Sequence, residues 1–514
     1  MKWFLQIGSA VLLGVALGVE FGVVGVAFHN LSSSSRPTVR LDHGTFLENG
    51  SGNVSQFLGI PYALSPTGDR RLRLPKPHPP YNGTYNATTF GLLCPQQPVM
   101  PVTPNEELAQ LLGALRSSGN AQGEDCGFQA EETAIYDGGV IVQTSLDLGL
   151  PVVYISMNYR LSAYGPLGGA EIKNAGVGNL GLQDYPKKVI IWGESAGAMS
   201  VGTHVLANDG NAEGLFRGGI MQSGSPLPVG DIMHGQKYYN LMVERTGCAG
   251  ASDTLQCLRQ VPYDVFQAAS NSTPSIFDYQ SMQLPWWPRA DGVFLKENAQ
   301  LLTEQGRVAD MPFISGDCED EGTFFSLSSH NVTTDYEARG YIASNYYPQS
   351  TADDINRLMA LYPSDPAQGS PFDTGADNAL SPQYKHLAAL QGDLAFQAPR
   401  RFFLRARADA HQRIWAFLSK RLKSLPYMGS FHGSDNVYGS GNLDLVDFFV
   451  RFAHTLDPNV GAPRTGAVHW PRYSSASPAL MTFLDGAVSL ALSNDTYRSE
   501  GFELLTQLTL EHPF

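Results

Sequence analysis

The chain alternates between short apolar runs and longer stretches with helical periodicity. The apolar runs are rich in β-branched residues and predict buried strands at residues 152–159, 188–192, 216–222, 311–316 and 413–418. Helix-like stretches such as residues 237–246 and 353–362 lie between them. Because these strands are apolar throughout, they fit a parallel sheet that is covered on both faces. No repeat, low-complexity tract or linker divides the chain, so the pattern predicts one α/β domain, residues 38–514.

The N-terminus has the features of a targeting segment. Lys2 precedes an apolar stretch over residues 3–19 whose length and glycine content favour a secretory signal peptide over a spanning helix. We predict a signal peptide at residues 1–27, with cleavage after Ala27 preferred to cleavage after Gly18. An uncleaved signal anchor, which would hold the protein on a membrane, is the alternative. No later run is apolar and long enough to predict another membrane span.

Cysteines and glycosylation sequons support export from the cell. The odd count of five cysteines implies two disulfides and one free thiol in an oxidising compartment. Proximity in the sequence favours the pairs Cys94–Cys126 and Cys248–Cys257, which would leave Cys318 free, but proximity does not fix the connectivity. An N-x-[ST] sequon at Asn30 lies close to the signal segment. The other potential glycosylation sites are Asn49, Asn53, Asn82, Asn86, Asn271, Asn331 and Asn494.

The composition excludes two classes of protein. Basic residues number 34 and acidic residues 48, so the net charge of −14 would repel phosphate backbones and excludes a basic nucleic-acid binder. Aromatic residues make up 11% of the chain and no long charged run occurs, which argues against disorder.

The pentapeptide at residues 193–197, Gly-Glu-Ser-Ala-Gly, matches the G-x-S-x-G nucleophile motif. The match alone is weak, but an apolar strand precedes Ser195 and an alanine-rich helix start follows it. The chemistry needs such a sharp strand-to-helix turn, because it lifts the serine hydroxyl above the sheet. We therefore predict that Ser195 is a nucleophile; an ordinary glycine-rich turn is the alternative.

A serine nucleophile needs a base and an acid that orients the base. Four carboxylates follow the strand predicted at residues 311–316, and spacing alone does not choose among them or exclude a solvated or calcium-binding loop. Of the seven histidines after these acids, only His432 lies in a Gly/Ser-rich loop after a strand, whereas His454 lies in a helix-like stretch. The four acids are Asp317, Glu319, Asp320 and Glu321.

Longer segments carry a family resemblance. They are VIIWGESAGAMSV, FRGGIMQSGSPLP, GDCEDEGTFFS and SFHGSD, with LDHGTF, FLGIPYA and GDRRLRLP near the N-terminus. Together they resemble the type-B carboxylesterase and lipase family, which includes the cholinesterases and the fungal Candida-type lipases. The resemblance runs from about Thr38 to the C-terminus and implies an α/β-hydrolase fold, a mostly parallel central sheet with helices on both faces.

The resemblance also implies roles for single residues. Glu321 corresponds to the family's acid in the D-E-G triplet, and His432 corresponds to the histidine of its G-x-x-H loop. The pairs Cys94–Cys126 and Cys248–Cys257 match family disulfides. The first pair closes a 33-residue loop that acts as a flap or lid in the lipase branch.

This loop has a pattern of its own. Residues 104–116 follow Thr103, a possible N-cap, and place four leucines on one face of a predicted helix. Such a helix either packs on the core or forms a mobile lid that contacts a lipid interface, and the pattern leaves both open. The leucines are Leu108, Leu111, Leu112 and Leu115.

Two departures from the family pattern indicate absent segments. Cys126 is followed directly by Gly127, where the family has a strand and an HGGG-like motif. Asp184 is followed at once by the nucleophile strand, where the family has a long amphipathic helix. Parallel strands need a covering crossover, usually helical, and residues 161–187 contain no convincing helix. The flanking motifs stay in register, so we expect coding sequence excised in a gene model, with true deletions as the alternative.

These features predict a secreted serine hydrolase that cleaves carboxylic esters, either a carboxylesterase or a lipase, by acyl transfer. Ser195 would attack, His432 would move the proton, Glu321 would orient the imidazole, and N–H groups of Ala196 and Gly127 would hold the oxyanion. The mechanism implies no metal and no cofactor, and its partner is a small-molecule or lipid ester. A catalytically impaired truncated form and a non-catalytic cholinesterase-like recognition protein are the alternatives. The sequence sets neither the acyl chain, the alcohol nor the oligomeric state.

Overall fold

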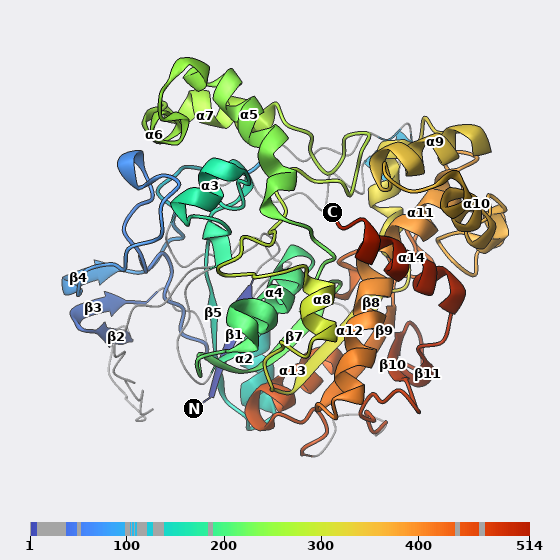
Figure 1. Ribbon diagram of the computed structural model, residues 1–514. Coiled ribbons are helices and arrows are strands. Elements are labelled where there is room, and N and C mark those ends of the chain that lie inside the picture. Colours follow the sequence, from blue (N-terminus) through green and yellow to red (C-terminus); the bar gives the residue numbers. More distant parts are fainter. Residues whose placement is uncertain are drawn as a thin grey trace.

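The computed structural model describes residues 2–7, 37–48, 53–97, 103, 105, 106, 108, 109, 121–126, 138–182, 189–436, 443–461 and 468–514. Within these residues the centre is an eight-stranded sheet in the order β11-β10-β9-β8-β7-β6-β1-β5 (Figure 1). Its strands are β1 (Lys2–Ile7), β5 (Val152–Ser156), β6 (Val189–Glu194), β7 (Phe216–Gln222), β8 (Phe313–Cys318), β9 (Ile414–Lys420), β10 (Ala479–Leu484) and β11 (Leu490–Asn494). All neighbours are parallel except β10 and β11, so the predicted mostly parallel sheet is confirmed.

Five of these strands lie where the apolar runs predict them. β7 matches its predicted bounds, and β5, β6, β8 and β9 shift by at most three residues at either end. The pattern missed the antiparallel pair β10–β11 and a second, small sheet of β2 (Thr38–Leu41), β3 (His43–Leu47) and β4 (Asn82–Asn86). Polar and exposed positions interrupt β2, β4 and β11, so these strands lack the continuous apolar run of a buried parallel strand.

The N-terminal strand occupies an unexpected place in the sheet. β1 lies between β5 and β6 and is parallel to both, with Phe4 in register with Tyr154 on one side and Ile190 on the other. Six residues of the predicted signal peptide thus form an inner strand of the sheet. Between Cys126 and β5 the described residues contain the helix α2 (Gly138–Asp147) and no strand. The position beside the nucleophile strand is therefore filled from the start of the chain.

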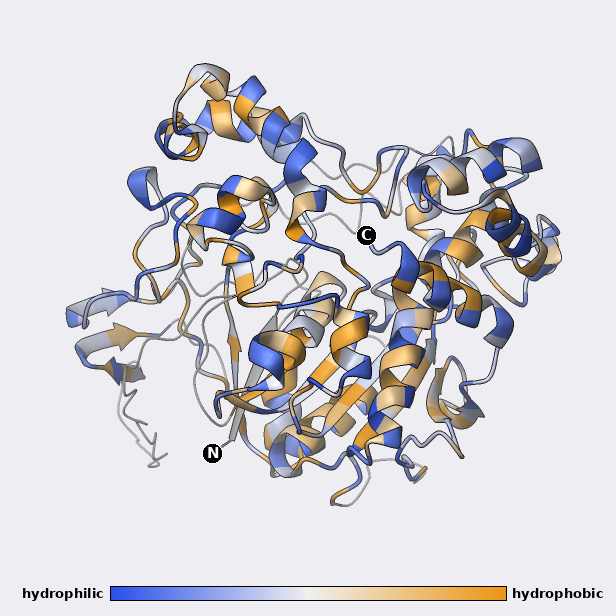
Figure 2. Ribbon diagram, viewed as in Figure 1, coloured by the Kyte–Doolittle hydropathy of each residue, from blue (hydrophilic) through white to orange (hydrophobic). Residues whose placement is uncertain are grey.

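Apolar side chains of the strands divide between two cores, one on each face of the sheet. Ile190 and Trp192 of β6 and Phe417 of β9 join a buried cluster with α2 and α13. Ile191 and Leu418, the neighbours in sequence, join the cluster on the other face with α4, α8, α12 and α14. Figure 2 shows the apolar colour concentrated on the central strands and on parts of the surrounding helices. This alternation explains why the strands are apolar throughout.

The helices cover both faces and the upper edge of the sheet as drawn in Figure 1. Two groups, α5 to α7 and α9 to α11, lie above that edge. Among its described residues, 157–182, the crossover from β5 to β6 holds one α-helix, the six-residue α3, in line with the absence of a convincing helix in the sequence pattern. The remaining helices are α3 (Ala170–Ala175), α4 (Ala196–Gly210), α5 (Gln236–Arg245), α6 (Thr254–Gln260), α7 (Tyr263–Asn271), α8 (Ala299–Glu304), α9 (Asp335–Asn345), α10 (Ala352–Leu361), α11 (Tyr384–Gly392), α12 (Ala398–Asp409), α13 (Leu443–Thr455) and α14 (Ser499–Glu511).

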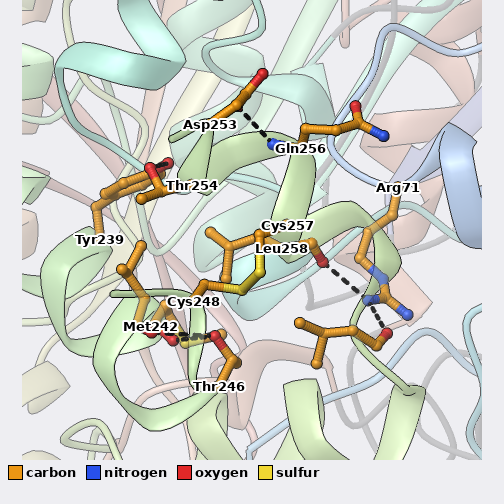
Figure 3. Close-up of a disulfide and its surroundings, with 12 residues drawn as sticks. Arg71, Tyr239, Met242, Thr246, Cys248, Asp253, Thr254, Gln256, Cys257 and Leu258 are labelled. Atoms are coloured by element: carbon orange, nitrogen blue, oxygen red, sulfur yellow. Dashed lines mark hydrogen bonds between the residues drawn. A yellow bond between two sulfur atoms is a disulfide. The ribbon is translucent and has the colours of Figure 1, made fainter. Parts of the chain in front are cut away.

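Two disulfides fasten the connections on the β5 side of the sheet. Cys94 and Cys126 are bonded with a Cα separation of 4.9 Å, and Cys248 and Cys257 with one of 5.8 Å. Figure 3 shows the second bridge between the start of a short turn and α6, beside Arg71. The Arg71 guanidinium donates to the carbonyl of Leu258 at 3.0 Å and pairs with Glu124 next to the first bridge, so it ties the two regions together.

No helix among the described residues is long and apolar enough to cross a membrane.

Candidate active site

Ser195 occupies a strained turn between β6 and α4. Its φ of 57° and ψ of −125° lie in a region that a residue with a Cβ adopts only when the surrounding structure holds it there. The neighbouring strand helps to hold it, because the Ser195 N–H donates to the Gln222 carbonyl at 2.8 Å. A Cβ on Gly193 would lie 2.2 Å from the carbonyl carbon of Gly197, so strand and helix approach this closely only with glycine at position 193. The motif thus forms the turn that the chemistry requires.

The imidazole of His432 lies between Ser195 and Glu321. Its Nε2 is 2.7 Å from Ser195 Oγ, and its Nδ1 is 2.5 Å from Glu321 Oε2. The His432 side chain is 9% exposed and that of Glu321 is fully buried. The three residues follow β6, β8 and β9, and the carboxyl ends of parallel strands meet at one edge of a sheet. The arrangement can serve as nucleophile, base and orienting acid.

The other three candidate acids, at the end of β8 and in the loop after it, have different partners, which removes the ambiguity that spacing left. Asp317 is buried and accepts from the Arg400 guanidinium at 2.6 Å. Glu319 pairs with Lys420 and Lys423 at the surface side of the loop. Of the four acids, Glu321 is the one whose carboxylate contacts His432.

Asp320 instead anchors the turn that carries His432. One carboxylate oxygen accepts from the Ser430 N–H at 2.9 Å and from Lys423 Nζ at 2.6 Å. The other accepts from the Ser370 hydroxyl and the Phe372 N–H at 3.0 and 2.8 Å. Asp320 therefore fixes the position of the base without contacting it.

The glycine of the D-E-G triplet is required by close packing. A Cβ on Gly322 would lie 1.9 Å from the Ala388 carbonyl oxygen on α11. This close approach sets Glu321 at the start of a short helical turn, with its Oε1 accepting from the Cys318 N–H at 2.7 Å. The triplet thus combines an anchor, the acid and a packing contact.

The surroundings of His432 favour its charged form. Burial acts to lower the pKa of His432, but the charge and hydrogen bond of Glu321, with the charges of Glu194 and Asp435, raise it to about 9. Glu194 Oε1 lies 3.5 Å from His432 Nε2. The rings of Phe325 and Phe396 lie against the imidazole, with centroid distances of 4.9 and 4.7 Å. Aromatic walls and three carboxylates therefore surround the base.

Several of these contributors were missed by the sequence analysis. Glu194 is the variable position of G-x-S-x-G, and Asp435 lies three residues after His432, so both stood inside recognised motifs. Phe325 follows Glu321 by four residues, whereas Phe396 comes from a distant segment with no local signal. The motifs named the reacting groups but not the groups that set their charge.

Some of the remaining predicted residues lie within the described part of the chain and others lie outside it. Ala196 is the first residue of α4 at the end of the strained turn. Gly127, the second predicted oxyanion residue, lies outside the described residues, as does Asp184. Cys318 is free and buried, and burial raises the pKa of its thiol well above the usual value, which keeps it neutral.

Part of the Cys94–Cys126 loop packs on the core. Leu108 is 2% exposed and belongs to a buried cluster with Met428 and Phe431, the residue before His432. Asn105, rather than Thr103, caps this segment, since its side chain accepts from the Leu108 N–H at 2.9 Å. The other three leucines of the predicted helix lie outside the described residues.

A serine, a histidine and a buried glutamate in contact at the carboxyl edge of a mostly parallel sheet define an α/β hydrolase. The sequence matches the model of the Carboxylesterase family over residues 43–128 and 123–499. It is 36% identical to Lipase 2 of Diutina rugosa, over 92% of this chain and 96% of that protein. It is 34% identical to a secreted triacylglycerol lipase of Gibberella zeae, over 92% and 90%. The fold resembles the crystal structure of Aspergillus niger EstA with a TM-score of 0.73, at 22% identity over 93% and 99%.

The chain belongs to the carboxylesterase family and is a carboxylic ester hydrolase. The comparison also bears on the absent segments. The two matched stretches meet at residues 123–128, which is the Cys126 junction. The alignment with Lipase 2 runs over 536 positions but covers only 92% of 514 residues, about 473, so roughly 60 positions have no counterpart here. The first observation places a break in the family match at the Cys126 junction, whereas the absence of a segment after Asp184 stays a prediction.

The assignment of the acid is testable by two matched substitutions. Replacing Glu321 by glutamine should lower kcat by about 10⁴-fold, because the amide neither fixes the productive tautomer nor stabilises the imidazolium. Replacing Asp320 by asparagine should lower the melting temperature and reduce kcat far less, because Asp320 contacts the turn and not the imidazole. Steady-state kinetics and thermal unfolding of both variants check this. Full activity in Glu321→Gln with loss in Asp320→Asn would show that the acid is Asp320.

Proposed function

We propose that this protein is a secreted serine esterase or lipase that uses Ser195, His432 and Glu321 for acyl transfer. The observation that carries the proposal is the continuous contact from Ser195 Oγ through both imidazole nitrogens to Glu321. The intact triad also argues against a non-catalytic recognition protein, since nothing in that role requires the three side chains to be aligned. No protein–protein function is needed to account for this site.

The reaction would proceed through an acyl-enzyme. Ser195 Oγ attacks the ester carbonyl carbon while His432 Nε2 takes the hydroxyl proton, and Glu321 stabilises the imidazolium through Nδ1–H. The tetrahedral intermediate collapses as His432 returns the proton to the leaving alcohol oxygen, which leaves the acyl group on Ser195. Water then attacks the acyl carbon while His432 takes its proton, and His432 returns that proton to Ser195 Oγ as the bond between Oγ and the acyl carbon breaks and the carboxylic acid departs. Proton and acyl group are both passed on, so the enzyme returns to its starting state.

The negative oxygen of the intermediate needs hydrogen-bond donors. Ala196 supplies one, because the first N–H of a helix has no acceptor within the helix and lies at the positive end of its dipole. Gly127 is the proposed second donor. Each such donor is worth about 10²–10³-fold in kcat, so the chain's activity depends strongly on the segment around Gly127.

The substrates are proposed to be lipid esters. Two relatives carry lipase names, and one of them is a secreted triacylglycerol lipase. The cluster of Leu108 with Phe431 supports a role for the Cys94–Cys126 loop at a lipid interface, because it places an apolar side chain of the loop beside the turn of His432. A lipid surface would offer this loop the same apolar contacts as the core does.

Secretion and glycosylation form part of the proposal. Six sequon asparagines fall within the described residues, and all six are exposed, as an attached glycan requires. They are Asn53, Asn82, Asn86, Asn271, Asn331 and Asn494. The two disulfides fit an oxidising compartment.

The test uses a form of the protein, here called the restored form, in which family sequence fills the two junctions. It carries about 25 to 30 residues after Cys126 and about 20 after Asp184, enough for a strand and a crossover helix. This form should hydrolyse p-nitrophenyl butyrate at about 1 to 10³ turnovers per second, and an emulsified triacylglycerol faster than the same ester in solution. A restored, folded form that cleaves neither substrate would contradict the proposed function.

A further inference from the structure

A buried carboxylate that interacts with the base belongs to none of the predicted roles. Asp435 follows His432 by three residues in the short helical turn Ser434–Asn436, and it is fully buried. The pentapeptide motif, the D-E-G triplet and the oxyanion donors all leave it unexplained. Burying a carboxylate costs free energy unless hydrogen bonds and a positive charge compensate it, so the partners of Asp435 must supply that compensation.

Gln222 connects this carboxylate to the nucleophile. The Gln222 side-chain amide donates to Asp435 Oδ2 at 2.9 Å, and its oxygen accepts from Trp192 Nε1 at 2.5 Å. The backbone carbonyl of the same residue accepts from the Ser195 N–H at 2.8 Å. One residue of β7 therefore holds both the strained turn of Ser195 and the turn of His432.

The charges around His432 give Asp435 a second effect. The groups that act on the imidazole are Glu321, Glu194 and Asp435, and Ser195 faces its Nε2. Burial, with a smaller contribution from the charge of Glu321, raises the pKa of Asp435 to about 6, although Gln222, His432 and the Cys318 thiol oppose this rise. Asp435 and the imidazolium therefore stabilise each other, and the stabilisation grows as His432 accepts the serine proton.

We propose that Asp435 is a positioning residue of the active site, which holds the His432 turn on Gln222 and stabilises the protonated imidazole. The inference rests on the proposed function, since it concerns the same triad. It assigns Asp435 an effect through His432 and not on the substrate, so the effect must be visible in the titration of His432.

Three variants of the 514-residue chain separate this role from a structural one. Asp435→Asn removes the charge and keeps the shape, whereas Asp435→Ala also removes the nearer of the two acceptors for the Gln222 amide, which leaves Asn436 Oδ1 at 3.3 Å. Asp291→Asn is the control, because Asp291 is also a buried carboxylate but accepts from the N–H groups of Val293, Phe294 and Leu295. The first readout is the rate at which a phosphonate probe labels Ser195 between pH 5 and 10, a range that includes the usual histidine pKa of about 6.5. The second readout is the NMR titration of His432, whose signal is assigned by its loss in His432→Gln.

Labelling requires neutral His432, so its rate falls as the pH falls through the pKa of that residue. Asp435→Asn should lower this pKa by about one unit or more. The pH at which the labelling rate falls then moves down by the same amount, and labelling at pH 7 becomes about tenfold faster. Asp435→Ala should show the same shift and a high-pH rate about 10²-fold lower, because the turn loses its anchor. Asp291→Asn should change the melting temperature without changing the pH at which the labelling rate falls.

An unchanged His432 pKa in Asp435→Asn would overturn the inference, whatever happens to stability. An Asp435→Ala variant that does not fold leaves the asparagine variant to decide. Failure of Ser195 to take any label in the restored form would count against the proposed function instead. In that case the NMR titration of His432 still decides the role of Asp435.

Discussion

Replacing Ser195 by alanine in the restored form is expected to lower kcat by about 10⁶-fold and to abolish labelling by an organophosphonate probe. The reason is that no other hydroxyl occupies the strained turn 2.7 Å from His432 Nε2. Ester hydrolysis by direct attack of water would remain, supported only by the oxyanion donors and substrate binding. Mass spectrometry of the labelled protein and steady-state kinetics give both readouts.

Ser200 offers a matched control on the same helix. Its hydroxyl is buried one turn further along α4 and donates to the Ala196 carbonyl, so Ser200→Ala removes a hydroxyl close to the site without removing a reacting group. This variant should keep its label and most of its activity. Labelling that survives Ser195→Ala would instead show that a different residue is the nucleophile.

The sequence predicted the strands β5 to β9, the nucleophile Ser195 and the base His432 because their signals are local. A strand that is buried on both faces must be apolar throughout, and the motifs around Ser195 and His432 fix tight turns. The choice of Glu321 over Asp320 needed the family resemblance, because the distinction depends on Lys423 and Ser430, which come from distant parts of the chain. Spacing along the chain cannot carry that information.

The edge strand β11 and the carboxylate of Asp435 near the base were not predicted, for related reasons. β11 has half-exposed positions and only pairs on one side, so its pattern resembles that of a loop. Asp435 is recognisable only through Gln222 on another strand. β1 was not predicted for a different reason. Its apolar run after Lys2 fits the pattern of a signal peptide, and its pairing with β5 and β6 depends on whether another strand takes the same position in the sheet.

Removal of the N-terminal strand is expected to have a large effect on folding. The place between β5 and β6 needs a strand, because otherwise both strands lose a ladder of backbone hydrogen bonds in the middle of the sheet. In this chain Lys2–Ile7 fills it, although those residues belong to the predicted signal peptide. Removal of residues 1–27 should therefore unfold the 514-residue chain, whereas the restored form, with its own strand after Cys126, should tolerate the same removal.

Four proteins test this: the 514-residue chain and the restored form, each with and without residues 1–27. We expect the 514-residue chain to express poorly and to be less active than the restored form by about 10²–10³-fold for each oxyanion donor that is absent. Hydrogen exchange of the β5 and β6 amides should show protection in the restored form with or without the leader, and in the shorter chain only with it. The transcript sequence across the junctions at Cys126 and Asp184 distinguishes excised coding sequence from true deletion. If the transcript confirms the short junctions, and the 514-residue chain without its leader folds and cleaves p-nitrophenyl butyrate at enzymatic rates, then the sheet closes without this strand and the prediction is wrong.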